Sequence, residues 1–127
     1  MNEELRLETY KSLTTYAAAG LSFVLTANGA AAIAVLTFLG HFVAAGKAPV
    51  PDLRASLALF ISGVFVGGVA TMTAYFTQLK IYNGLIDQSS IAQDDGHQAW
   101  FRATLLLISI GTVVFGIGAI WAVNSLY

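Results

Sequence analysis

The hydrophobic and polar residues of this chain alternate on a long scale, with three uncharged runs separated by short polar segments. No Asp, Glu, Lys or Arg occurs in residues 12–46, 55–79 or 103–127. A helix of about 20 apolar residues crosses the hydrocarbon core of a bilayer. The pattern therefore predicts an all-α integral membrane protein with three transmembrane helices. The expected spans are about residues 20–42, 55–79 and 103–125.

The first helix is expected to extend beyond the membrane at its N-terminal end. Asn2 is the predicted N-cap, and Glu3 and Glu4 follow in the first turn, where the helix dipole favours negative charge. Only glycines interrupt the sequence from there to residue 45. We therefore predict one long helix, with residues 3–18 at the membrane surface or in solution.

Two polar segments connect the three predicted helices. In the first segment, Gly46 suits a helix C-terminus and two prolines prevent continuation, so Asp52 is expected to cap the second helix. The second helix is expected to reach about residue 86. Asp95 and a glutamine three residues later have capping-box spacing, which places the start of the third helix near His97.

The composition agrees with a membrane protein and excludes several functions. Hydrophobic residues make up 57% of the 127 residues and charged residues only 10%, whereas a typical soluble domain carries about a quarter charged residues. The length favours a single domain, residues 1–127. A net charge of −1 without a basic cluster argues against a nucleic-acid partner. The absence of cysteine excludes disulfides and thiolate metal sites.

The basic residues predict the orientation in the membrane. With three crossings, four basic residues share the side of the N-terminus and two lie on the other side. The four are Arg6, Lys11, Lys80 and Arg102, and the two are Lys47 and Arg54. The positive-inside rule then favours a cytoplasmic N-terminus. The first residues do not resemble a signal peptide, because acidic residues precede a long apolar run.

Few residues of the chain could carry chemistry. His41 and His97 lie on opposite sides in the predicted topology, and the cluster of Asp94, Asp95 and His97 is better explained as a helix cap than as a metal site. No nucleophile elbow, P-loop or dinucleotide fingerprint occurs. No ionisable residue falls inside a span, as proton-coupled carriers usually require. We therefore expect no enzymatic activity, no cofactor and no metal.

Small residues at helical spacing indicate close contact between helices, because they let backbones approach each other in lipid. Gly63 and Gly67 form a Gly-x-x-x-Gly motif, with Thr71 four residues later. The predicted helix-contact residues are Asn28, Gly29, Gly63, Gly67, Thr71 and Gly116. The pattern leaves open whether these residues pack within one three-helix bundle or between chains.

Asn28 is the most unusual of these residues, since an amide is poorly placed near the middle of a membrane. No ionisable or metal-binding group lies within a turn of it, and a chain break there would leave unpaired backbone groups in lipid. The remaining interpretation is a contact point, at which Asn28 donates and accepts hydrogen bonds across a gap thinned by Gly29 and its neighbouring alanines. Its partner is either another helix of the same chain or a second chain.

A polar stripe on the second helix allows a different interpretation. The stripe consists of Thr71, Tyr75, Gln78 and Tyr82, which lie on one helix face. Ser22 and Thr26 lie on one face of the first helix together with Gly29. If several subunits joined, such faces could line a water-filled path. Otherwise these side chains form hydrogen bonds between helices or with their own helix.

Three short motifs resemble those of small uncharacterised bacterial multi-span membrane proteins. They are Tyr10-Lys11-Ser12, Asn28-Gly29-Ala30-Ala31 and Phe38-Leu39-Gly40, and the similarity continues through AYFTQ at residues 74–78. The resemblance implies a bacterial cytoplasmic membrane and several spans, and it implies no catalytic residue.

These observations favour a non-enzymatic membrane protein that acts through helix–helix association, as a homo-oligomer or as an accessory subunit of a membrane complex. Its expected partners are the lipid bilayer and either its own helices or those of other membrane proteins. The alternative is a pore-forming or membrane-perturbing protein, such as a holin-like protein or a defence effector. The chain ends directly after its third span with WAVNSLY, whereas holins typically end in a charged tail.

Overall fold

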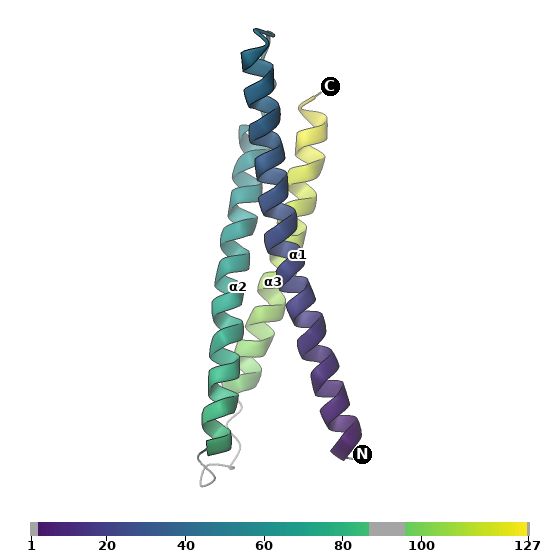
Figure 1. Cartoon of the computed structure of the whole chain (residues 1–127), viewed down its shortest axis with the longest axis vertical. Helices are drawn as coiled ribbons and strands as arrows, with labels where there is room; N and C mark the ends of the chain where they lie inside the picture. The colour runs from purple at the N-terminus through teal and green to yellow at the C-terminus, as the bar shows by residue number, and fades with distance from the viewer. Residues whose placement is uncertain (1–2, 87–95, 127) are drawn as a thin grey trace.

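The computed structural model describes residues 3–86 and 96–126, which form three long helices (Figure 1). They are α1 (Glu3–Ala44), α2 (Arg54–Ile86) and α3 (Gly96–Asn124). Each contains a stretch long and apolar enough to cross a membrane, and these candidate spans are Glu8–Ala44, Arg54–Asn83 and Gln98–Asn124. The described residues contain no strand, so the predicted all-α fold with three candidate spans is confirmed.

The first helix runs without interruption, as its sequence predicts. It contains 42 residues, and Asn28 and Gly29 lie near its middle without breaking it. At 1.5 Å per residue, α1 is about 63 Å long, which is about twice the thickness of a bilayer's hydrocarbon core. Part of α1 must therefore extend beyond the hydrocarbon core. The predicted N-caps Asn2 and Asp95 lie outside the described residues.

The first helix ends in a Schellman motif centred on Gly46. Gly46 has a φ of 63°, a left-handed conformation that glycine adopts without steric cost. Its N–H donates to the carbonyl of Val43 at 3.0 Å, and the N–H of Lys47 donates to the carbonyl of Phe42 at 3.3 Å. These two bonds satisfy carbonyls that the end of the helix leaves free.

The second helix starts eight residues later with a side-chain cap. The Oδ1 atom of Asp52 accepts a hydrogen bond from the backbone N–H of Arg54 at 3.2 Å. Leu53 supplies the first carbonyl of the helical pattern, which accepts from Leu57 at 2.9 Å, and the Leu53 side chain is buried. The short connection makes α1 and α2 antiparallel neighbours.

The three helices do not pack equally along their lengths. Figure 1 shows α2 and α3 as an antiparallel pair, whereas α1 crosses this pair at its middle and its N-terminal half diverges. On the far side of the crossing, α1 packs against the beginning of α2. The core cluster there consists of Ala32, Val35, Leu53 and Phe60.

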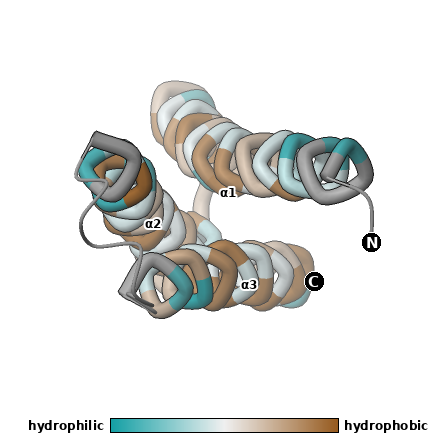
Figure 2. The backbone as a smooth tube through the Cα atoms, turned by 90° about the horizontal axis from the view of Figure 1, so that it is seen from below, coloured by the Kyte–Doolittle hydropathy of each residue, from teal (hydrophilic) through white to brown (hydrophobic). Residues whose placement is uncertain are grey.

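The outer surface of the bundle is apolar. Phe65, Ile33, Met72 and Leu106 have between 64% and 73% of their side chains exposed, although each lies within a candidate span. Figure 2 shows hydrophobic residues along all three helices and hydrophilic residues mainly near the helix ends. A surface of this kind is unfavourable in water and matches the hydrocarbon of a bilayer. The chain therefore has the surface of a membrane protein.

Candidate helix-contact site

Asn28 lies where the three helices meet, and its side chain has no exposed surface. Its Nδ2 atom donates to the carbonyl of Val24, one turn earlier in α1, at 2.8 Å. The same atom lies 3.4 Å from the carbonyl oxygen of Gly111 in α3. On the side of α2, a Cβ atom added to Gly63 would overlap the Asn28 amide group. One side chain of α1 thus contacts both other helices.

The Oδ1 atom of Asn28 is buried and has no conventional donor among the described residues. Because a Cβ at Gly63 would point at this oxygen, a Cα–H of Gly63 takes that direction instead. Cα–H···O contacts of this kind recur between closely packed helices and contribute about 0.5–1 kcal/mol. Glycine at position 63 therefore gives the amide both space and a weak donor.

Gly67 of α2 and Gly111 of α3 also leave space that side chains of α1 fill. Val24 is fully buried, and its Cγ1 atom would lie 2.5 Å from a Cβ at Gly111 and 3.2 Å from one at Gly67. Leu25 would come within 2.8 Å of the same Gly67 position. Gly63 and Gly67, the Gly-x-x-x-Gly pair, thus both pack against α1 of their own chain.

The remaining predicted contact residues lie away from this crossing. A Cβ atom added to Gly29 would lie 4.0 Å from Val64, which is an ordinary van der Waals distance. A Cβ atom added to Gly116 would meet no atom within 4 Å. Thr71 is exposed, and its hydroxyl donates to the carbonyl of Gly67 at 2.9 Å within its own helix. The structure thus brings Asn28, Gly63 and Gly67 to one place and leaves the other three at its edge or outside it.

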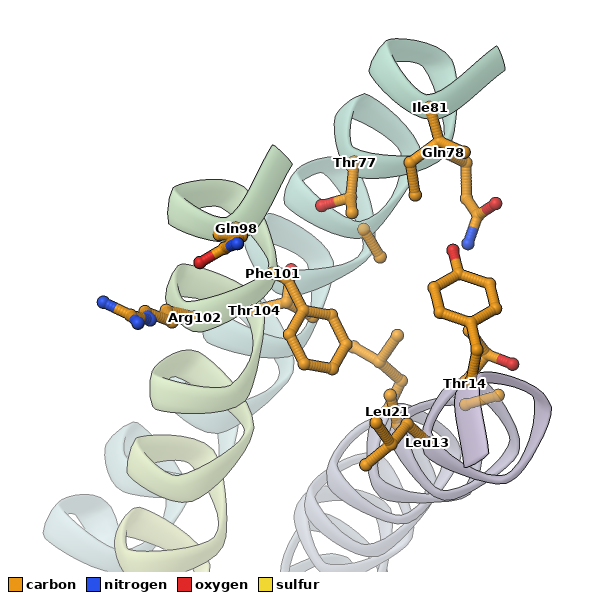
Figure 3. Close-up of a pocket in the computed structure, with 14 residues that line it drawn as sticks. Leu13, Thr14, Leu21, Thr77, Gln78, Ile81, Gln98, Phe101, Arg102 and Thr104 are labelled. Atoms are coloured by element: carbon orange, nitrogen blue, oxygen red, sulfur yellow. The ribbon is translucent and has the colours of Figure 1, made fainter. Parts of the chain in front are cut away.

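The two tyrosines of the predicted polar stripe of α2 face away from the bundle axis. Tyr75 and Tyr82 are 63% and 61% exposed. Gln78 is also exposed and lines a cavity between the helices (Figure 3). The opposite face of α2 makes the polar contact with α3, where the hydroxyls of Thr73 and Thr104 lie 2.9 Å apart.

This threonine pair and the glycine at position 111 were not predicted from the sequence. Each hydroxyl has one proton, so one of the pair donates to the other, and the accepting hydroxyl donates to a carbonyl of its own helix, that of Ala70 for Thr73 or that of Trp100 for Thr104. Thr77 is buried one turn after Thr73. The spacing of Thr73 and Thr77 by four residues is the signal in the sequence that could have found this face. The stripe through Thr71 has similar spacing, and nothing in the sequence ranks one above the other.

Metal-binding and catalytic groups do not gather in the described part of the chain. No group of three His, Cys, Asp or Glu residues that could hold a metal ion occurs there. His41 lies in the last turn of α1 and residue 97 in the first turn of α3, at opposite ends of the bundle (Figure 1). Asp94 and Asp95 lie outside the described residues. The crossing at Asn28 is thus a packing site with a buried amide, and it contains no titratable group.

Comparison with known proteins adds no relative from which a function could be transferred. No protein-family model, no curated protein and no solved structure matches this chain.

Proposed function

We propose that this protein is a non-enzymatic membrane protein that acts through helix–helix association, as a homo-oligomer or as an accessory subunit of a membrane complex. The charge pattern supports a cytoplasmic N-terminus, and the resemblance of its short motifs to those of small bacterial membrane proteins supports the bacterial cytoplasmic membrane. The proposal depends on finding a surface that is built for close contact and is not already used within the chain. The outward face of α1 has these properties.

Small residues recur on that face at steps of three or four. We call this set the outer stripe of α1, and all of its residues are exposed. Its small residues are Ala19, Ser22, Thr26, Ala30, Thr37 and Gly40, and the larger Ile33 lies between Ala30 and Thr37. Such steps keep residues on one helix face. The buried residues Val24, Asn28 and Val35 lie on the opposite face, so the stripe points away from α2 and α3.

The hydroxyl groups of this stripe lack hydrogen-bond partners among the residues that the structure describes, and this observation carries the proposal. Most described Ser and Thr hydroxyls in the helices donate to a carbonyl of their own helix, as Thr15 does to Lys11 at 2.9 Å. Within the described residues, Ser22, Thr26 and Thr37 make no such bond. An unpaired hydroxyl in hydrocarbon is costly. A helix packed against the stripe would supply acceptors, and the small residues would let it approach.

The Gly-x-x-x-Gly motif cannot serve as the outward surface at the same time. Gly63 is covered by Asn28, and Gly67 is covered by Leu25 of the same chain. Substitution at either glycine therefore tests the bundle itself. A test of association must use α1's outward face.

Cysteine crosslinking in native membranes tests the proposal, because the chain has no cysteine of its own. Thr26→Cys places a thiol on the outer stripe. Ser62→Cys is the matched control, since Ser62 is exposed on α2 and its neighbour Gly63 contacts Asn28, which puts both thiols at similar depth.

Disulfide-linked dimers from Thr26→Cys and not from Ser62→Cys would establish a homo-oligomer. If no dimer forms, a photoreactive residue at position 26 separates the remaining cases. An adduct with a second membrane protein, absent for position 62, supports the accessory subunit. The proposal is abandoned if neither the cysteine nor the photoreactive residue at position 26 gives an adduct that is absent when the same group is at position 62.

A pore remains the second candidate function, and one observation favours it. Tyr75 and Tyr82 of the stripe face outward on a candidate membrane-spanning helix, where an assembly could enclose them, and Gln78 of the same stripe lines the cavity between the helices. Two features weigh against it. The hydroxyl of Thr71, the next residue of this stripe, is already hydrogen-bonded to the carbonyl of Gly67. Pores are often lined by rings of charged side chains from several subunits, and no described residue of the stripe would supply such a charge.

A further inference from the structure

A half-open space of about 420 Å³ separates the first part of α1 from α2 and α3 (Figure 3). It is lined by residues of three segments, 10–21, 74–81 and 98–104, and we call residues 10–21 the arm of α1. The lining is mostly apolar, and Figure 3 shows the ring of Phe101 directed into the space. The arm thus lies beside the other two helices without packing closely against them.

The inward-facing residues of α1 follow a seven-residue repeat that continues through the arm. Val24 and Asn28 of this repeat are buried at the crossing, the three positions before them are half-buried, and Tyr10 is exposed. The four positions in the arm all line the space. The arm therefore carries the same face that packs at the crossing. In alternating steps of four and three, the repeat consists of Tyr10, Thr14, Ala17, Leu21, Val24 and Asn28.

The other two helices carry the same repeat along the whole length of the space. On α2 it runs from Phe60 to Ile81 and on α3 from Phe101 to Gly118, and each of its positions is buried or half-buried. A seven-residue repeat stays on one side of a helix only if the helix supercoils, because a straight helix drifts by about 20° per repeat. Figure 1 shows that the arm does not wrap around the pair but leads away from it.

The contacts at the crossing determine which residues of α2 would face the arm. Asn28 lies against Gly63, and Val24, one turn earlier, lies against Gly67, one turn later. The two helices are thus antiparallel in a fixed register. The same register gives three further pairs in the arm, and all six of their residues line the space. These pairs are Ala17 with Ala74, Thr14 with Thr77, and Tyr10 with Ile81.

We propose that the arm is a strap with two positions, the open one of this structure and a closed one in which it packs in the seam between α2 and α3. The facing alanines, Ala17 and Ala74, let the two backbones approach each other closely. Closing also removes the apolar lining from any water that enters at the membrane surface, which is favourable.

Gly20 is the point at which the arm would bend. At this residue α1 still approaches α3, because an added Cβ atom would lie 3.0 Å from Ile108. Tyr10 lies about 15 Å before Gly20 along the helix. A bend of about 20°, at the boundary between gentle curvature and a kink, would therefore move Tyr10 by about 5 Å. The rest of α1 stays in place, because the crossing and the core cluster around Phe60 hold it.

Distances between two spin labels, measured in nanodiscs with one protein each, test for the two positions. The chain has no cysteine, so labels attach only at introduced cysteines. Glu8→Cys and Asn83→Cys label exposed positions on α1 and α2 at the open end. We expect two distances for this pair, of which the shorter belongs to the closed position. Thr37→Cys and Ser62→Cys, both exposed, label the packed half as a control and should give one distance.

A larger side chain in the seam should prevent closing. Ala17→Leu is expected to remove the shorter distance, and an unchanged distance for the control pair would show that the bundle is intact. Ala34→Leu makes the same change at an exposed position of α1 outside the arm and should leave both distances.

A disulfide tests the predicted register independently. Thr14→Cys and Thr77→Cys should form an intramolecular disulfide in the same nanodiscs, because these positions face each other in the closed position. Ser12→Cys with Thr77→Cys should not, since Ser12 is exposed and lies about 200° around the helix from position 14.

Four results would overturn the proposal. A single distance at the open end, long or short, would mean that the arm has one position. Two distances that persist in Ala17→Leu would mean that closing does not use the seam. The same holds if the Thr14 pair forms no disulfide, or if the Ser12 pair forms one as readily.

Discussion

Gly63 of α2 lies directly against the side-chain amide of Asn28 in α1, so closely that a Cβ atom at position 63 would overlap it. This pair fixes the point at which α1 crosses the other two helices, because the same amide reaches the carbonyl of Gly111 in α3. An amide in the middle of a span is tolerated here because the neighbouring helices surround it.

The first prediction concerns the space at Gly63. Gly63→Ala is expected to lower the free energy of unfolding by about 1–3 kcal/mol, since the added methyl group overpacks against Asn28. Gly116→Ala is the control. Its Cβ meets open space, and alanine favours a helix by up to about 1 kcal/mol, so this variant should be neutral or more stable. Unfolding in mixed micelles, followed by circular dichroism, measures both.

A double variant shows whether Asn28 is the group that the new methyl meets. Asn28→Ala shortens the side chain, so adding it to Gly63→Ala should cost less than the sum of the two single changes. Strict additivity would mean that the two residues do not share this contact.

The second prediction concerns the amide group of Asn28. Asn28→Leu removes the hydrogen bonds to Val24 and Gly111 and should destabilise the bundle by about 1 kcal/mol, within the range for interhelical hydrogen bonds. Insertion should be unchanged, because leucine is more favourable in lipid than asparagine. Carbonate extraction measures insertion and micelle unfolding measures stability. A variant that inserts and is as stable as wild type would show that the amide contributes only packing.

Sequence patterns predicted the helices better than the faces of the helices. Runs without charge located three spans, and the signals at Gly46 and Asp52 correspond to the observed ends of α1 and α2. The inward face is harder to read, because a helix in lipid is apolar all round and lacks the polar side that marks the outside of a soluble helix. Thr71 and Thr73 illustrate this, since two residues change the direction by about 200°. Thr71 points outward and Thr73 reaches α3.

The glycines show the same limit. Gly111 and Gly116 are both in α3, but Gly111 receives Val24 and Gly116 faces open space. The sequence alone does not show which of these two glycines lies against another helix. Asn28 was identifiable because its amide has a cost in lipid that a contact must offset. An amide near the middle of a span therefore predicts an interior position more reliably than a small residue, whereas hydroxyl-bearing residues such as Thr26 and Thr71 also lie on exposed faces.

The third prediction concerns the threonine pair between α2 and α3. Thr104→Val keeps the shape of the side chain and removes the hydroxyl that lies 2.9 Å from that of Thr73. We expect a loss of about 0.6 kcal/mol, the average for such bonds in membranes. Thr112→Val is the control, because the Thr112 hydroxyl is exposed and bonds only to its own helix. A double-mutant cycle with Thr73→Val isolates the bond, and a coupling of zero would exclude it.

The fourth prediction separates the pore from the proposed association. If the polar stripe of α2 lined an aqueous path, expression would dissipate the membrane potential and Gln78→Leu would reduce the leak. Association without a pore predicts no leak at any expression level. A potential-sensitive dye in growing cells measures the effect. Ser109→Leu is a suitable control for added hydrophobicity, since Ser109 is exposed on α3 outside the stripe.

The last prediction concerns the outer stripe of α1. Thr26→Leu and Asn28→Leu change positions only two residues apart but on opposite faces, because Thr26 is exposed and Asn28 is buried. Thr26→Leu should weaken association, since it removes an unpaired hydroxyl and adds bulk where a neighbouring helix approaches. It should leave the unfolding of the single bundle unchanged.

Mass in detergent and crosslinking in membranes measure association, and micelle unfolding at high dilution measures the bundle. Asn28→Leu should show the reverse pattern in these two assays, with a weaker bundle and, where the bundle still forms, retained stripe contacts. If Thr26→Leu changed only bundle stability, the outward face of α1 would have no role between chains. The two variants therefore test separately the inward and outward faces of one helix.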